Sequence, residues 1–135
     1  MENTSKEIAL QILNENNIGV MATNNGGRPN SRYMTFEYVE NKLYTVAKQN
    51  SDVVNELKEI AATHILLGYE SDGLFETFLE IEGNTAITFN DNVKRQLLEK
   101  YPADTDEELV VIQVTPTRMR IMNKNGKNQE EVHLN

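Results

Sequence analysis

Apolar and polar residues alternate through positions 28–38, which read RPNSRYMTFEY and follow a turn rich in Asn and Gly. Alternation of this kind, with aromatic residues, is typical of a β-strand, in which successive side chains point to opposite faces. The more apolar face is expected to point inward. It carries Asn30, Arg32, Met34, Phe36 and Tyr38. The pattern therefore predicts a guanidinium on the inward face of a strand, in an acidic protein.

Arg32 needs a partner on that face, because burying an unpaired charge costs several kcal/mol. Three arrangements would satisfy it: an ion pair with one of the 21 acidic residues, a side chain that snorkels to solvent, or a bound ligand anion. The residue chemistry leaves all three open.

Similar patterns predict three short helices and a series of strands along the rest of the chain. The helices are expected at 4–17, 50–62 and 90–102, and the other strands at 18–23, 43–47, 63–70, 74–87, 108–123 and 128–135. We expect the first three strands, joined by tight turns, to form an antiparallel meander, and Gly83 to mark a bulge. The order predicts a mainly β fold with short helices, a small antiparallel barrel of about six strands.

The bulk properties narrow the class of protein. A length of 135 residues without a linker suits a single domain over residues 1–135. A formal net charge of −8 argues against nucleic acid or an anionic membrane surface as the main partner. The absence of cysteine excludes disulfides and thiolate catalysis. No signal peptide or long apolar run is visible, so a cytoplasmic protein is expected.

Residues with catalytic or metal-binding chemistry form no recognisable motif, so the catalytic residues stay unassigned and no metal site is expected. The two histidines, His64 and His133, lie far apart in the sequence. His64 is expected to be partly buried with a hydrogen-bond partner. Glu80 and Glu82 share one face of a strand, where we expect them to be solvated rather than to act as an acid/base pair.

Ser51 begins the second predicted helix, and free N–H groups at a helix start favour an anion. Together with Arg32 and Lys48 it would form a phosphate site without a glycine loop. The simpler interpretation is that Ser51 only caps the helix.

Several stretches, taken in order, resemble the FMN-binding split barrels of the pyridoxamine 5′-phosphate oxidase-like family, in particular its general-stress-protein branch. They are IGVMATNNGGRPNSRYMTF, NKLYTVAKQNSDVVNEL, HILLGYES with FLEIEGNTAI, and DEELVVIQVTPTRMRIMN. The similarity covers about residues 8–123. It implies a six-stranded antiparallel split β-barrel and a homodimer that holds FMN at the subunit interface.

The resemblance also implies roles for individual residues. Arg32, in the P-x-x-R pattern, would contact the FMN phosphate, and the backbone of Tyr33, Met34 and Thr35 would run along the flavin ring. The helix-start serine of the family corresponds to Ser51.

Two patterns of the family are incomplete in this chain. The pattern T-x-x-x-S-x-K has Ala47 and Val53 at its first and last positions, and Lys48 is the candidate substitute for the missing charge. The pattern R-x-E-x-W reads Arg118, Arg120, Met122, without the acid and the aromatic residue.

Three functions are open on this basis. The first is an FMN-dependent oxidoreductase acting on a small-molecule substrate of unknown identity. The second is a non-enzymatic module that binds FMN or a related anionic heterocycle, such as haem or a deazaflavin. The third is a dimer whose ligand site has decayed.

Overall fold

The computed structural model describes residues 4–15, 17–68, 77–102, 108–123 and 129–133 of the chain. Within them it has three helices: α1 (Ser5–Glu15), α2 (Asp52–Glu59) and α3 (Asp91–Lys100). The strands are β1 (Ile18–Asn25), β2 (Arg28–Thr35), β3 (Glu37–Val39), β4 (Lys42–Lys48), β5 (Ala62–Leu67), β6 (Thr77–Thr88), β7 (Leu109–Asn123) and β8 (Gln129–Val132). None of the described helices is long and apolar enough to span a membrane.

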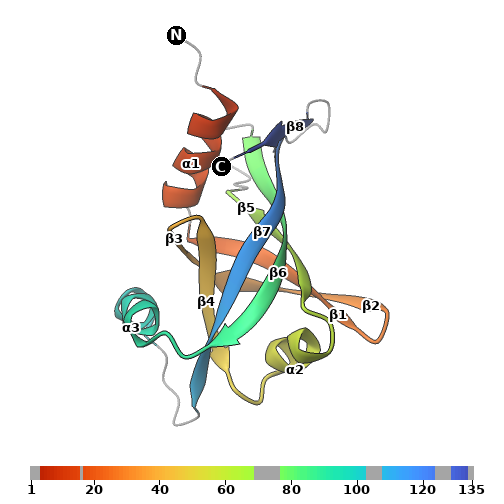
Figure 1. The fold of residues 1–135 in the computed structure, drawn as a ribbon, viewed down its shortest axis with the longest axis vertical. Coiled ribbons are helices and arrows are strands. Elements are labelled where there is room, and N and C mark those ends of the chain that lie inside the picture. Colours follow the sequence, from red (N-terminus) through yellow and green to blue (C-terminus); the bar gives the residue numbers. More distant parts are fainter. Residues whose placement is uncertain (1–3, 16, 69–76, 103–107, 124–128, 134–135) are drawn as a thin grey trace.

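The strands form one curled antiparallel sheet in the order β2-β1-β5-β6-β7-β4-β3, and β8 pairs with β7. Figure 1 shows the long β6 and β7 at its centre. The sheet forms half a barrel, which confirms the predicted mainly β fold with short helices and its antiparallel split-barrel class. The described residues include eight strands rather than six, because β3 and β8, with three and four residues, add to six longer ones.

The predicted meander of the first three strands is wrong. The strand predicted at 28–38 breaks at Phe36, so that β2 pairs with β1, whereas β3 pairs with β4. These two pieces lie at opposite ends of the sheet order. At the break, Phe36 N donates to Asn17 O at 2.6 Å, and Asn17 Nδ2 donates to Phe36 O at 3.0 Å. Asn17 thus satisfies both backbone groups of Phe36, while the ring of Phe36 is buried in the core.

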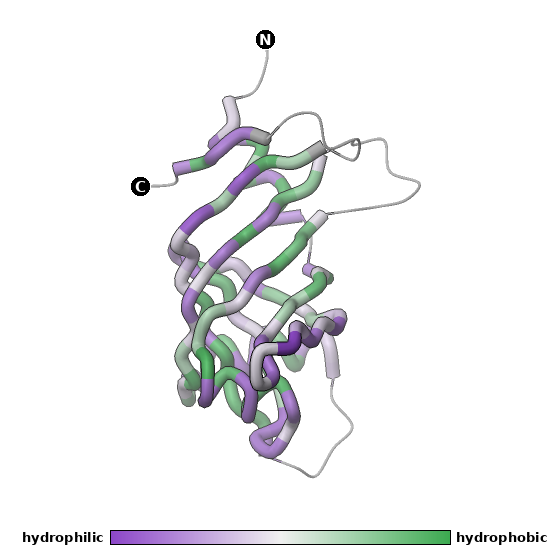
Figure 2. Tube along the Cα trace, turned by 90° about the vertical axis from the view of Figure 1, so that its right-hand side faces the viewer, coloured by the Kyte–Doolittle hydropathy of each residue, from purple (hydrophilic) through white to green (hydrophobic). Residues whose placement is uncertain are grey.

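The hydrophobic core lies on the inner face of the curled sheet. Figure 2 shows apolar and polar positions alternating along the strands, as a sheet with one buried face requires. Helices α1 and α2 add apolar side chains to this core, among them Leu13 and Val54. Helix α3 instead contributes Val93 and Leu97 to a smaller cluster with Tyr44 and Val111.

Local sequence features explain the ends of several elements. Thr4 directly precedes α1, and its hydroxyl accepts a hydrogen bond from Glu7 N at 3.2 Å, as in a capping box. In the turn after β1, Gly26 and Gly27 have positive φ values of 57° and 92°. The register between β6 and β7 shifts between Glu82 and Gly83, at the predicted position, although the extra residue of this bulge, Thr117, lies on β7. Residues 71–73, between the strands predicted at 63–70 and 74–87, lie outside the described residues.

Candidate functional site

Arg32 lies on β2 and points to the inward face, as the alternation predicts, with 22% of its side chain exposed. Its Nη1 donates to Thr23 Oγ1 at 2.6 Å, and its Nη2 lies 3.5 Å from Glu56 Oε1. The ion pair is therefore the arrangement that this structure displays, out of the three that the sequence left open. Its remaining N–H groups have no hydrogen-bond partner among the described residues.

Glu56, on the second turn of α2, is the acidic partner that the sequence analysis did not identify. It is only 8% exposed and accepts hydrogen bonds from Thr23 Oγ1 at 2.7 Å and from Asn30 Nδ2 at 3.1 Å. The Thr23 hydroxyl, with Asn30 and Arg32, holds the pKa of Glu56 below its ordinary value, against burial, which raises it. One signal was present in the sequence, because Glu56 stands three residues after Val53 and so falls on the buried stripe of the helix.

Strand β2 carries the three residues predicted to run along a flavin ring. It is the last strand of the sheet order, and among the described strands it pairs with β1 alone, so its outer backbone groups have no partner in them. The Tyr33 side chain points outward and is 79% exposed, whereas Met34 packs against the core. Thr35, opposite Ile18, is the last residue of β2.

Ser51 directly precedes α2 in an extended conformation, so it occupies the predicted cap position. Its hydroxyl, however, donates to Lys48 O at 2.7 Å and accepts no bond from the helix. Ser51 is therefore the N-cap residue, as the sequence predicts, but it caps without a side-chain hydrogen bond to the helix. Lys48 is exposed, and its ammonium has no ion-pair partner in the part of the chain that the structure describes. Val53 is buried in the core.

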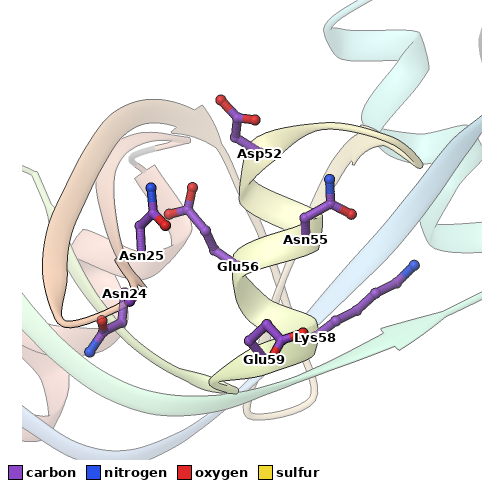
Figure 3. Close-up of a pocket in the computed structure, with 8 residues that line it drawn as sticks. Asn24, Asn25, Asp52, Asn55, Glu56, Lys58 and Glu59 are labelled. Atoms are coloured by element: carbon purple, nitrogen blue, oxygen red, sulfur yellow. The ribbon is translucent and has the colours of Figure 1, made fainter.

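The structure brings Arg32 against the same helix that Ser51 begins, through the second-turn residue Glu56. An open groove of about 450 Å³ lies between α2 and the β1–β2 turn (Figure 3). It is lined by Asn24, Asn25, Gly26, Asp52, Asn55, Glu56, Lys58 and Glu59. None of the six predicted cofactor residues lines this groove, and its three carboxylates against one lysine disfavour an anion there.

A second polar cluster lies on the other face of the sheet, across β5, β6 and β7. The prediction that Glu80 is solvated is wrong, because it is only 9% exposed. Arg120 Nε donates to Glu80 Oε1 at 3.0 Å, Arg120 Nη2 also contacts this oxygen, and His64 Nε2 lies 3.4 Å from it. Burial raises the pKa of Glu80, but the bonds from Arg120 and His64 outweigh it and lower the pKa.

Glu82 joins this cluster, and one ligand atom from each of His64, Glu80 and Glu82 lies within 4.8 Å of the others. Such groups can hold a metal ion, but here the guanidinium of Arg120 already supplies the cation for Glu80. The cluster is best described as an ion-pair network across three strands. The partly buried His64 with its hydrogen-bond partner agrees with the sequence expectation.

Comparison with known proteins gives one consistent result. A family model described as Pyridoxamine 5′-phosphate oxidase matches residues 5–123. The chain is 29% identical to General stress protein 26 of Bacillus subtilis over 134 residues, which cover 96% of each protein.

Solved structures agree at the level of the fold. General stress protein 26 from Bacillus anthracis superposes with a TM-score of 0.76 at 21% identity, over 94% of this chain and 98% of that one. A heme binding protein from Mycobacterium smegmatis gives a TM-score of 0.76 at 19% identity, over 98% of this chain and 59% of that one.

Proposed function

This chain belongs to the pyridoxamine 5′-phosphate oxidase family, and from that premise we propose that it binds FMN along the open edge of β2. The observation that carries the proposal is the position of β2 as an edge strand, with Tyr33, Met34 and Thr35 at its end. Unpaired peptide groups of an edge strand are free to bond an added partner. The polar edge of a flavin ring presents both donors and acceptors to such groups.

The part of the proposed site that would bind the FMN phosphate has only some of the groups that such a site needs. Lys48 is exposed and free to approach an anion, and the start of α2 offers backbone N–H groups without a side-chain cap. Arg32 retains N–H groups that neither Thr23 nor Glu56 uses. The ring therefore fits this edge better than the phosphate fits the helix start.

We further propose that the bound flavin makes the protein an FMN-dependent oxidoreductase. Flavin supplies the electron transfer when it is bound, so the protein has to bind and orient it and exclude side reactions. No side chain is then required as acid or base, which agrees with the sequence, where no catalytic motif was found.

A homodimer with the flavin at its interface is the assembly we propose. Ile18 and Tyr33 are 60% and 79% exposed, and the β1–β2 register places both on the outer face of these strands. Large apolar side chains gathered on one face favour contact with another protein surface. The face lies beside the proposed flavin edge, so one surface would serve both contacts.

The test is a titration of purified, flavin-free protein with FMN, followed by flavin fluorescence and by melting temperature. We expect a dissociation constant in the micromolar range or tighter and a raised melting temperature. No binding up to about 1 mM, where the binding free energy is only about 4 kcal/mol, would contradict the proposal and favour a dimer without a ligand site.

A second experiment separates an enzyme from a binding module. The flavin-loaded protein is mixed with NADH or NADPH without oxygen, and the flavin absorbance is followed. Bleaching by either donor supports the oxidoreductase. Tight binding with no bleaching by either would contradict an NAD(P)H-linked oxidoreductase and favour non-enzymatic binding.

A further inference from the structure

We propose that Glu56 is an internal anion that competes with the flavin phosphate for Arg32, so that the protein binds riboflavin and FMN with similar affinity. The inference rests on the proposed flavin site and concerns which flavins it accepts. Riboflavin and FMN share the ring system and differ only in the terminal phosphate. The ratio of their affinities therefore isolates what the phosphate contributes.

The carboxylate of Glu56 is fixed beside Arg32 by groups other than Arg32. Thr23 and Asn30 both donate to it, at 2.7 Å and 3.1 Å, and the residue is buried. A phosphate that approaches Arg32 therefore meets a guanidinium whose charge is already balanced, next to a carboxylate that cannot swing into solvent without losing these bonds.

The other groups that would bind a phosphate are also occupied or missing. The Ser51 hydroxyl already donates its hydrogen bond to Lys48 O, so it has no second donor for a ligand. Asp52 stands in the first turn of α2 and places a carboxylate where the helix dipole would favour an anion. Ala47 and Val53 bring no polar group.

Of the predicted phosphate ligands in the described part of the chain, Lys48 is the cation that no carboxylate pairs, and it is exposed to solvent and to screening by salt. The ring system, which riboflavin and FMN share, would bind the backbone edge of β2. This part of the site therefore contributes equally to the affinity for both flavins. A phosphate of about −1.5 to −2 charges gains little from one exposed lysine when Glu56 and Asp52 add negative charge to this part of the protein. The site consequently has little preference for the phosphorylated flavin.

The experiment measures dissociation constants of riboflavin and FMN for the full chain and for two variants. In the unmodified protein we expect the two constants to agree within about threefold, as for a single exposed ion pair. Glu56→Gln removes the charge and keeps one oxygen that can accept from Thr23, while the second oxygen, which accepts from Asn30, becomes an NH₂ donor. It should tighten FMN by about tenfold or more, the scale of a charge-assisted hydrogen bond, and leave riboflavin unchanged.

Glu59→Gln is the matched control, because Glu59 lies on the same helix, is exposed and has no contact with Arg32. It should leave the ratio of the two constants unchanged. Melting temperatures without ligand confirm that each variant is folded. A preference for FMN above about 100-fold in the unmodified protein, or an unchanged ratio in folded Glu56→Gln, would overturn the inference while the flavin site stands. Binding of neither flavin would overturn the proposed function itself.

Discussion

Arg32 and Glu56 form a partly buried ion pair, and each charge is stabilised by the other. Arg32→Ala would leave the Glu56 carboxylate buried without its cation, so we expect a loss of about 1–3 kcal/mol in the free energy of unfolding. Urea denaturation measures this loss. In the double variant Arg32→Ala with Glu56→Gln the loss should be smaller than the sum of the single losses, since no orphaned charge remains.

Arg28→Ala is the matched control for this prediction. Arg28 lies on the same strand but is exposed. An equal loss in Arg28→Ala and Arg32→Ala would show that the ion pair contributes nothing specific to stability.

Glu56 and Glu80 make the stability of the protein depend on pH in a defined direction. Both have pKa values below the ordinary carboxyl value in the folded state. Their contribution is fully present above the unfolded pKa and is lost as the pH falls from the ordinary carboxyl range through the lower folded pKa. In Glu56→Gln the melting temperature should therefore fall less steeply over this range. Parallel profiles of the two proteins would contradict the assignment for Glu56.

At the scale of elements, the bulge between β6 and β7 lies beside a glycine that has no room for a side chain. A Cβ atom at Gly83 would lie 2.8 Å from Thr115 O and 2.9 Å from Val114 Cγ1. Gly83→Ala should cost about 1–3 kcal/mol, the usual scale of overpacking, by urea denaturation. Ala86→Ser, at an exposed position of the same strand, is the control, and equal stability of the two variants would contradict the prediction.

The local pattern of apolar and polar residues was sufficient to predict most of the helices and strands. The helix predicted at 90–102 is α3, capped by Asn90, whose Oδ1 accepts from Val93 N at 3.2 Å. The alternation also put Arg32 on the correct face. Such features depend on neighbours within a few residues, which a sequence displays directly.

Two features that the sequence did not predict depend on distant partners. The break at Phe36 requires Asn17, which lies 19 residues earlier. The burial of Glu80 requires Arg120, which the register of β6 with β7 places opposite it. Neither partner can be read from the local alternation of apolar and polar residues, because pairing between strands is set by the whole sheet.

At the scale of the whole molecule, the proposed homodimer depends on the outer face of β1 and β2. The double variant Ile18→Ser with Tyr33→Ser should be monomeric where the unmodified protein is dimeric, because it removes the apolar area that the contact would bury. Light scattering after gel filtration measures the mass. Phe89→Ser, at an exposed aromatic residue before α3, should stay dimeric. A monomeric unmodified protein would contradict the proposed assembly.

The most direct test of the central claim is the change in backbone amide NMR shifts when FMN is added to labelled protein. Binding along the β2 edge predicts that the largest changes fall on Tyr33, Met34 and Thr35, with smaller ones at the start of α2. Changes centred instead on the groove between α2 and the β1–β2 turn would contradict this placement. No changes up to about 1 mM FMN would contradict flavin binding altogether.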